Sequence, residues 1–517
     1  MWFAPPHVGG EHEQTLTGAS LSVRHILSRA EERNMRKAKI VCTIGPACDS
    51  TSMLDRLIEH GMDAARLNFS HGTHESHAAA IKAIRQASEH RHKAVAIIQD
   101  LQGPRIRVGA VTDEGIEVGA GQLVRLQAML AQADGQLGAQ SISRPAVPEI
   151  PVTYQFFARD IRPGARILIN DGLVELVADR IIGGSVECTV TTGGRITSHK
   201  GINLPGTLVS APTLTDKDRE DIRFGIAQGV DYLALSFVRG PEDIAAARKF
   251  AAECGRELPI IAKIERAEAV ISLDAILEQA DGVMIARGDL GVEMDPETVP
   301  MLQKRIIVEA NRNRRLVITA TQMLESMTQA LRPTRAEASD VANAVFDGTD
   351  AVMLSAETAI GAHPIETVQV MDRIIRAAEA ETTLGWKPKV DMQSGEASIT
   401  EAICAAASSA VTSISASAIV AFSEQGRTAR LISKQRPPTP IIAFTPFEPI
   451  RQRMALYWGV RPYTMDQIEQ TDARVYEAER RLKAEGLVTT GQRIVILSGT
   501  RLGHPGGTNL IKLQEVG

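Results

Sequence analysis

Two short segments indicate how the chain folds: PIIAKIER at residues 259–266 and GVMIARGDLG at residues 282–291. Each begins as an apolar run of the strand type. Lys263 and Glu265 lie two residues apart at the end of the first run, so both point to one face of the strand. Asp289 lies in a glycine-bounded turn just past the second run. Either segment alone is more simply a buried ion pair beside a βα turn. Together, a cation and two carboxylates suit transfer of a charged group around a hard divalent metal.

Apolar runs of this kind recur from residue 36 to about residue 383 and alternate with longer amphipathic segments, which is typical of repeated βα units. Eight such units predict a (β/α)₈ barrel. Two adjacent Rossmann-like units are the alternative, although no GxGxxG follows the first strand. The expected strands are 39–44, 64–69, 94–100, 231–237, 259–265, 281–286, 316–321 and 350–354, and the expected helices include 74–89, 241–254, 266–279, 298–314, 334–346 and 364–380.

Three further segments interrupt or follow the barrel, which we expect at residues 36–103 and 213–383. Residues 104–212, after the third strand, have short alternating runs and many glycine turns, which predict an inserted small β domain acting as a lid. Residues 384–398 are a linker, and residues 399–517 alternate again as an open α/β regulatory domain. Residues 1–35 read as an extension with no place in a core, although translation could equally begin at Met35.

The composition, 44% apolar and 23% charged, is that of a soluble globular protein. The net charge is −5 with no basic block, which argues against a nucleic-acid surface. The five scattered cysteines fit a reducing compartment, and no apolar run reaches the length of a membrane span. The N-terminus has no apolar core of a signal peptide, so we expect a cytoplasmic protein without a membrane partner.

Polar residues gather where the predicted strands end, which is where barrels carry their sites. Arg66, Asn68 and Ser70 alternate at the end of the second strand and so share a face. The Arg66 guanidinium could grip a phosphoryl group through two hydrogen bonds. A single serine or threonine at such a place is more simply a helix cap or a satisfied core polar group. Other strands end in Asp100, Ser236, Lys263, Glu265, Asp289, Thr319, Thr321, Ser355 and Glu357.

This set of side chains predicts a site for a small phosphorylated carboxylic acid bound to a metal. Glu265 and Asp289 offer hard oxygen ligands to Mg²⁺ or Mn²⁺. Lys263 could neutralise charge on a phosphoryl group in transfer or on an enolate. The backbone N–H groups at Gly288 could bind a carboxylate, and Thr321 could position a water that relays a proton.

The chain resembles the pyruvate kinase family over residues 36–517. The motifs that carry the resemblance are long and stand in the family's order. They are KIVCTIGP (39–46), ARLNFSHG (65–72), AKIE (262–265), ARGDLG (286–291), TATQMLES (319–326), PTRAEASDVAN (333–343) and DAVMLSAET (350–358).

The resemblance implies an enzyme that transfers the phosphoryl group of phosphoenolpyruvate to ADP, the final step of glycolysis, and then protonates the pyruvate enolate. It implies a barrel, a lid and a C-terminal domain in a homotetramer that yields pyruvate and ATP. The residues that match the family's functional positions are Lys263 as the catalytic lysine, Glu265 and Asp289 at the divalent metal, Arg66 at the phosphoryl group, Gly288 and Thr321 at the carboxylate and proton-delivery site, and His71, Arg107 and Lys200 at the nucleotide.

The segment after the third strand departs from the K⁺-dependent members of that family. Those members carry a glutamate where this chain has Arg105 and often a threonine where it has Leu101. A fixed guanidinium can supply the positive charge that K⁺ otherwise gives to the phosphoryl and ADP pocket. We therefore expect that K⁺ is not required. The family's monovalent-cation positions match Asn68, Ser70 and Asp100, which would be structural partners here.

The C-terminal domain contains a second motif, SEQGRTA at residues 423–429, which runs from a strand end into a helix and could cradle an anion. Members activated by fructose 1,6-bisphosphate usually have a small or hydroxyl residue in place of Glu424. The carboxylate of Glu424 predicts little activation by that sugar phosphate.

Two other functions compete with the resemblance. A metal-dependent aldolase or lyase acting on a pyruvate enolate would share Glu265 and Asp289 but has no need of the lid, of Arg107 or of Lys200. A catalytically dead paralogue that binds metabolites would be expected to lose Lys263 or a metal ligand, and the chain keeps all three.

Overall fold

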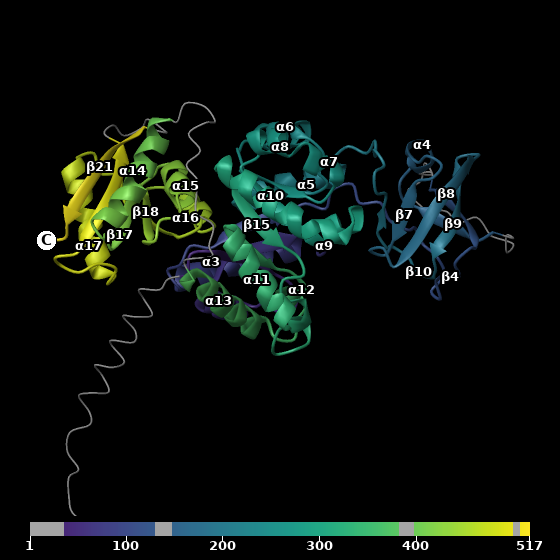
Figure 1. Ribbon diagram of the computed structural model, residues 1–517, viewed down its shortest axis with the longest axis horizontal. Helices are drawn as coiled ribbons and strands as arrows, with labels where there is room; N and C mark the ends of the chain where they lie inside the picture. Colours follow the sequence, from purple (N-terminus) through teal and green to yellow (C-terminus); the bar gives the residue numbers. More distant parts are fainter. Residues whose placement is uncertain (1–35, 130–146, 382–397, 500–506) are drawn as a thin grey trace, which may run out of the picture.

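The computed structural model describes residues 36–129, 147–381, 398–499 and 507–517, and it places three bodies in a row (Figure 1). A closed barrel stands in the middle, the inserted β domain at one side and the C-terminal domain at the other. The eight parallel barrel strands close in the order β1-β16-β15-β14-β13-β12-β3-β2. They are β1 (Lys39–Thr43), β2 (Met62–Asn68), β3 (Ala96–Asp100), β12 (Tyr232–Leu235), β13 (Ile260–Ile264), β14 (Gly282–Ala286), β15 (Leu316–Ala320) and β16 (Ala351–Leu354).

The predicted fold class is confirmed, and the barrel strands lie within a few residues of the expected ranges. Seven of these strands, all except β2, are buried at every residue, as parallel strands covered on both faces should be. The helices around the barrel are α2 (Thr51–His60), α3 (His74–His90), α5 (Asp216–Gln228), α6 (Pro241–Glu253), α7 (Ala267–Ile271), α8 (Leu273–Gln279), α9 (Arg287–Glu293), α10 (Val299–Arg312), α11 (Arg335–Asp347), α12 (Ala356–Ala359) and α13 (Pro364–Ala380).

One predicted helix was wrong in its continuity. Residues 266–279 form two helices, α7 and α8, which meet at Ser272 with φ −91° and ψ 14°. The starts of three other helices are set by N-terminal caps. Thr73, Thr215 and Thr334 each form a capping box, at the start of α3, α5 and α11 respectively.

The inserted segment has its own core. A six-stranded sheet has the order β11-β7-β8-β9-β5-β6, and β10 pairs with β4 beside it. Its apolar residues, with the fully buried Phe157 of α4 (Phe157–Asp160) among them, form a separate cluster. The strands are β4 (Ile116–Val118), β5 (Leu123–Ala128), β6 (Glu149–Val152), β7 (Arg166–Ile169), β8 (Val174–Ile182), β9 (Ser185–Thr192), β10 (Gly194–Ile196) and β11 (Ile202–Asn203).

The C-terminal domain is an open five-stranded sheet of order β19-β18-β17-β20-β21, parallel except for its last strand. The sequence predicts strands at residues 418–423, 440–445 and 493–498, which the structure contains, but it does not predict the two edge strands, β19 and β21. The elements are α14 (Ile399–Ser413), β17 (Ala418–Phe422), α15 (Arg427–Lys434), β18 (Ile441–Thr445), α16 (Glu448–Met454), β19 (Val460–Thr464), α17 (Thr471–Ala484), β20 (Arg493–Gly499) and β21 (Thr508–Glu515).

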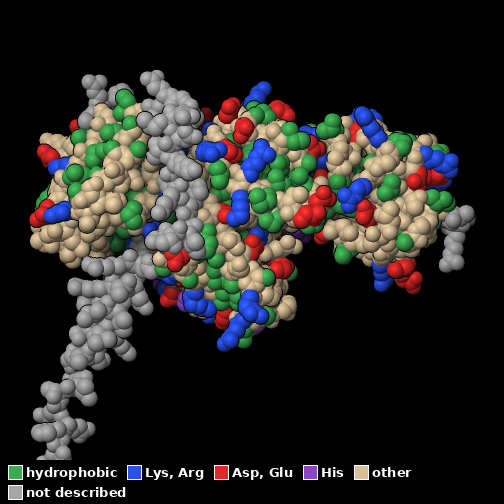
Figure 2. All heavy atoms as spheres, in the orientation of Figure 1, with side chains coloured by type: hydrophobic (Ala, Val, Ile, Leu, Met, Phe, Trp, Pro, Cys, Tyr) green, Lys and Arg blue, Asp and Glu red, His purple; other side chains and the backbone are tan. Residues whose placement is uncertain are grey.

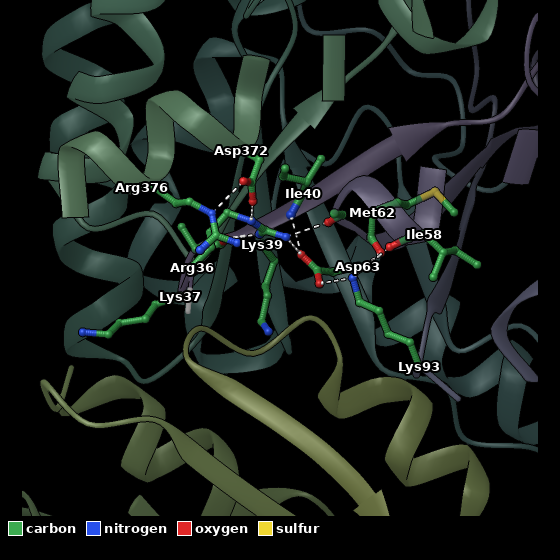
Figure 3. Close-up of polar contacts among 12 residues, drawn as sticks. Arg36, Lys37, Lys39, Ile40, Ile58, Met62, Asp63, Lys93, Asp372 and Arg376 are labelled. Atoms are coloured by element: carbon green, nitrogen blue, oxygen red, sulfur yellow. Dashed lines mark hydrogen bonds and ion pairs between the residues drawn. The ribbon is translucent and has the colours of Figure 1, made fainter. Parts of the chain in front are cut away.

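Charged side chains form a network at the amino-terminal end of the barrel, on the side that faces this domain (Figure 3). Arg36 pairs with Asp63 at 2.8 Å and with Asp372 at 2.8 Å, which fixes the start of the first barrel strand. Lys39 of β1 then donates a hydrogen bond of 2.8 Å to the carbonyl oxygen of Val460 in β19. The end of the barrel opposite the strands' carboxyl termini is therefore fastened to the C-terminal domain.

Candidate active site

The carboxyl ends of the barrel strands place Lys263 at the centre of a buried polar cluster. Its Nζ atom lies 2.7 Å from Oε1 of Glu265 and 3.3 Å from Oδ1 of Asp100, and it donates a hydrogen bond of 2.8 Å to Oγ of Ser236. Burial alone would lower the pKa of Lys263, but the charges of Asp100 and Glu265 raise it above its ordinary value. The ammonium group is therefore charged at neutral pH and held by three strands.

Asp100, at the end of β3, holds two cations at once. Its Oδ2 atom accepts a hydrogen bond of 2.6 Å from Nε of Arg66, while Oδ1 faces Lys263. Burial would raise the pKa of Asp100, but Lys263 and Arg66 outweigh it and lower that pKa. Arg66 also donates from Nη1 to Oγ1 of Thr43 at 3.1 Å, so within the described residues its Nη2 group is left for another acceptor.

Glu265 and Asp289 are the carboxylates that could hold a divalent metal. Glu265 accepts a hydrogen bond of 3.1 Å from the backbone N–H of Phe237, whose φ of 57° turns that group inward. Burial raises the pKa of Glu265, and although Lys263 opposes this, the Asp289 charge adds to it. A divalent cation between these carboxylates would relieve their repulsion, so the donor set fits such an ion.

Thr321 directly follows β15 in a left-handed conformation with φ 66°. Its hydroxyl accepts a hydrogen bond of 2.8 Å from the backbone N–H of Gly288 and donates one of 2.7 Å to the carbonyl oxygen of Ala320. Arg287 donates to the carbonyl oxygen of Thr321 at 2.6 Å and is itself paired with Asp340 at 2.6 Å. Strained backbone of this kind persists where surrounding contacts hold it, and these contacts hold Thr321 against the start of α9.

A group of cations lies between the barrel and the inserted domain. Burial lowers the pKa of His71, and the positive charges of Arg107, Arg105 and Arg66 lower it further, which puts all four groups within electrostatic range. Arg107 also donates a hydrogen bond of 2.9 Å to the carbonyl oxygen of His199. These cations repel one another, so the arrangement suits an anion.

The remaining predicted site residues, Lys200, Asn68 and Ser70, form contacts with their local backbone. Lys200 is exposed, and its backbone carbonyl oxygen accepts a hydrogen bond of 2.8 Å from Val108 N, which ties it to the segment that contains Arg107. Oδ1 of Asn68 accepts a hydrogen bond of 3.1 Å from Ser70 N, so the amide shapes the turn after β2.

Some polar strand ends serve the fold instead. Oγ1 of Thr319 meets Oγ1 of Thr349 at 3.0 Å in the interior. Glu357 accepts hydrogen bonds from the backbone N–H groups of Leu324 and Ser355. Conversely, the sequence did not predict that the Phe237 N–H group binds Glu265 or that Arg287 holds the Thr321 backbone. Arg287 does lie inside the motif ARGDLG.

The inserted domain contacts the barrel beside this cluster. Asn203 donates to Oε1 of Glu293 at 3.1 Å, and Arg239 donates to the carbonyl oxygen of Val209 at 2.6 Å. A cavity between the two bodies is lined by Arg105, Asp289 and Glu293 among others. The insert therefore borders Asp289, one of the carboxylates that could hold a metal.

Comparison with known proteins gives consistent results along the chain. Residues 35–368 match the family model described as pyruvate kinase, barrel domain, and residues 401–514 match pyruvate kinase, alpha/beta domain. Among curated relatives, pyruvate kinase 2 of a Synechocystis species is 43% identical over 93% of this chain and 79% of its own length. The pyruvate kinase of Corynebacterium glutamicum is 42% identical over 93% of this chain and 98% of its own. A crystal structure of a pyruvate kinase from Cryptosporidium parvum superposes with a TM-score of 0.84 at 36% identity, covering 94% of this chain and 97% of that one.

Proposed function

The chain belongs to the pyruvate kinase family, and from that premise we propose which of its residues carry out the reaction. The protein is a phosphotransferase that moves the phosphoryl group of phosphoenolpyruvate to ADP and yields pyruvate and ATP, the final step of glycolysis. The observation that carries the proposed roles is the buried Lys263 ammonium, held between Asp100, Glu265 and Ser236.

Lys263 and Arg66 supply positive charge where the phosphoryl group leaves the enolate oxygen. Asp100 orients both side chains through opposite carboxylate oxygens, so neither has to reorganise as charge develops. The Nη2 group of Arg66 then contacts a phosphoryl oxygen. Lys263 is therefore the catalytic lysine, and Asp100 is a positioning residue.

Members of the family generally need a divalent metal. In this chain Glu265 and Asp289 would hold it, as Mg²⁺ or Mn²⁺, and when bound it would polarise phosphoryl and carboxylate oxygens. The Phe237 N–H group fixes one oxygen of Glu265, which leaves the other toward Lys263 and the metal position.

The substrate carboxylate binds beside Gly288 and Asp289 at the start of α9, next to Thr321. The Gly288 N–H already donates to Thr321 Oγ1. We therefore propose that this glycine lets the substrate carboxylate come close to the backbone and does not donate a hydrogen bond to it. A Cβ atom there would lie 3.5 Å from Thr321 Oγ1, in the space beside that hydroxyl. Thr321 orders the water that returns a proton to the enolate carbon.

His71, Arg107 and Lys200 bind the phosphates of ADP, with the inserted β domain acting as a lid. The mutual repulsion of Arg105, Arg107 and His71 supports this assignment, because nucleotide phosphates would relieve it. Arg105 stands in for the monovalent cation, so K⁺ is not required. Asn68, Ser70 and Asp100 remain structural, which agrees with the engagement of Asp100 by two cations.

We further propose a homotetramer located in the cytoplasm, with no nucleic-acid or membrane partner. No helix among the described residues is long and apolar enough to cross a membrane. An extended basic surface would favour binding of nucleic acid. The face shown in Figure 2 instead has basic and acidic side chains interspersed.

A coupled assay that detects pyruvate tests the proposed function. The purified chain should release pyruvate from phosphoenolpyruvate only when both ADP and Mg²⁺ or Mn²⁺ are present. Release that is equally fast without ADP would contradict phosphoryl transfer, and release that is unaffected by a chelator would contradict the metal role of Glu265 and Asp289.

A further inference from the structure

A groove of about 1050 Å³ separates the amino-terminal end of the barrel from the C-terminal domain. Its barrel side comes from the end of α3 and from the turns that lead into β12 and β13, and its other side comes from α16, β19 and α17. The proposed catalytic residues lie at the opposite ends of the barrel strands. The groove is thus a separate site, and its size is that of small-molecule pockets.

Arginine is the commonest side chain of this groove, where seven arginines face five carboxylates. Some are neutralised in place, because Arg451 forms two hydrogen bonds with Glu448, of 2.8 and 2.9 Å. The balance differs at the barrel wall, where Arg85, Arg256 and Arg453 approach one buried carboxylate, Asp231.

Asp231 is already engaged. Its Oδ2 atom accepts hydrogen bonds of 2.7 Å from Arg85 Nη2 and 2.8 Å from the backbone N–H of Ile97, and the residue is 1% exposed. Arg85 is also satisfied, since it donates to the carbonyl oxygens of Val95 and Gly229. Of the three arginines, only Arg85 forms a hydrogen bond with the Asp231 carboxylate in the part of the chain that the structure describes.

The other two arginines have unused donors. Nε of Arg453 is buried without a hydrogen-bond partner, and its Nη2 reaches the carbonyl oxygen of Glu257 only at 3.4 Å. The Arg256 guanidinium makes no hydrogen bond or ion pair with the residues that the structure describes, and its Nη1 lies near Gly229, 4.0 Å from where a Cβ would be. Burial lowers the pKa of Arg256, and the positive charges of Arg453 and Arg85 lower it further against the opposing charge of Asp231.

We propose that this groove binds a phosphate-bearing anion, with the phosphate between Arg256 of the barrel and Arg453 of the C-terminal domain. Guanidinium groups are the side chains best matched to phosphate, because their forked donors meet two oxygens at once. A phosphate dianion would compensate the charges of Arg256 and Arg453, neither of which forms an ion pair with a carboxylate in the part of the chain that the structure describes. The remaining groove accommodates an organic part. Because the two arginines belong to different domains, the ligand would link the barrel to the C-terminal domain.

Equilibrium dialysis with two radiolabelled probes, inorganic phosphate and glycerol 3-phosphate, tests this proposal on the full chain. Phosphate groups could also occupy the active site, so the readout is the difference between variants. We expect R256A/R453A to lose one site per chain, or to weaken it about tenfold or more, as loss of charge-assisted hydrogen bonds should. The matched control R305A removes an exposed arginine of α10 and should retain every site.

Two further measurements make the result decisive. Because the double variant could disturb the domain interface, the single variant R256Q, which removes no contact with a described side chain, should also weaken binding while pyruvate formation stays unchanged. Tighter binding of glycerol phosphate identifies a phosphorylated metabolite as the ligand, and equal binding identifies free phosphate. If R256Q and R256A/R453A bind both probes as R305A does, the groove is not a phosphate site.

Discussion

Replacing Lys263 by methionine removes the central charge of the active site while keeping most of its volume. The ammonium group contacts Glu265 at 2.7 Å, Asp100 at 3.3 Å and Ser236 at 2.8 Å, and its side chain is 11% exposed. In this water-poor setting the loss of one preorganised charge typically costs ~10²–10³ in turnover. We expect K263M to lose at least that much, because Lys263 acts most strongly in the transition state.

The same substitution has a stability cost that must be separated from catalysis. Breaking a buried ion pair costs about 3–5 kcal/mol, since a charge is left uncompensated. Asp100 retains Arg66, and a divalent metal at Glu265 would offset the remaining charge, so we expect K263M to fold in the presence of Mg²⁺. Circular dichroism and thermal unfolding with Mg²⁺ check this point.

The assay is coupled detection of pyruvate at saturating phosphoenolpyruvate, ADP and Mg²⁺. The matched control K82M removes an exposed lysine of α3 and should retain full activity. Phosphoenolpyruvate should still bind to K263M, because Arg66 and the metal carboxylates remain. A turnover of folded K263M within about threefold of the parent, far short of the expected loss, would refute the role of Lys263.

Four other perturbations probe separate parts of the account. In potassium-free tetramethylammonium buffer, adding K⁺ should raise the activity of the parent chain less than about tenfold, which corresponds to about 1.4 kcal/mol. The R105E variant should become K⁺-dependent. A tenfold rise in the parent would contradict the proposal that Arg105 takes the place of the ion. T321V should lower turnover about a hundredfold or more if the hydroxyl serves proton transfer, with T321S retaining most activity; equal rates for the two variants would remove that role. Fructose 1,6-bisphosphate should leave the half-saturating phosphoenolpyruvate concentration of the parent nearly unchanged, and it should lower that concentration more in E424S. A large decrease of the half-saturating concentration in the parent would show that the Glu424 carboxylate does not exclude the sugar phosphate. Asp350 pairs with Lys434 at 2.5 Å and Arg436 at 2.9 Å across the domain interface, so D350N should destabilise the fold by about 3–5 kcal/mol in denaturant unfolding; an unchanged midpoint would mean that these pairs contribute little.

The barrel was predictable from sequence because each of its strands is a compact apolar run. Parallel strands covered on both faces carry that pattern strongly, and β13 and β14 show it at every residue. The edge strands of the C-terminal domain lack it. In β19 only Val460 is buried, and the strand contains Pro462; β21 alternates weakly and pairs antiparallel with β20.

The candidate site was predictable only as a set of residues. Strand-end positions identify Lys263, Glu265 and Asp100 as neighbours, but the sequence gives no sign that one carboxylate orients two cations. Backbone groups are also silent in a sequence, so the Phe237 N–H donated to Glu265 could not be expected. Likewise, the left-handed conformation of Thr321 depends on tertiary contacts with Arg287.

Phosphorus NMR of a single reaction mixture tests the central claim most directly. With phosphoenolpyruvate, ADP and Mg²⁺, the parent chain should move the phosphoenolpyruvate signal to the γ-phosphate of ATP, with pyruvate and ATP formed in equal amounts. The K263M chain, folded and at the same concentration, should leave the phosphoenolpyruvate signal in place over the same time. Pyruvate that accumulates with inorganic phosphate instead of ATP, or transfer by K263M at the parent's rate, would contradict phosphoryl transfer driven by Lys263.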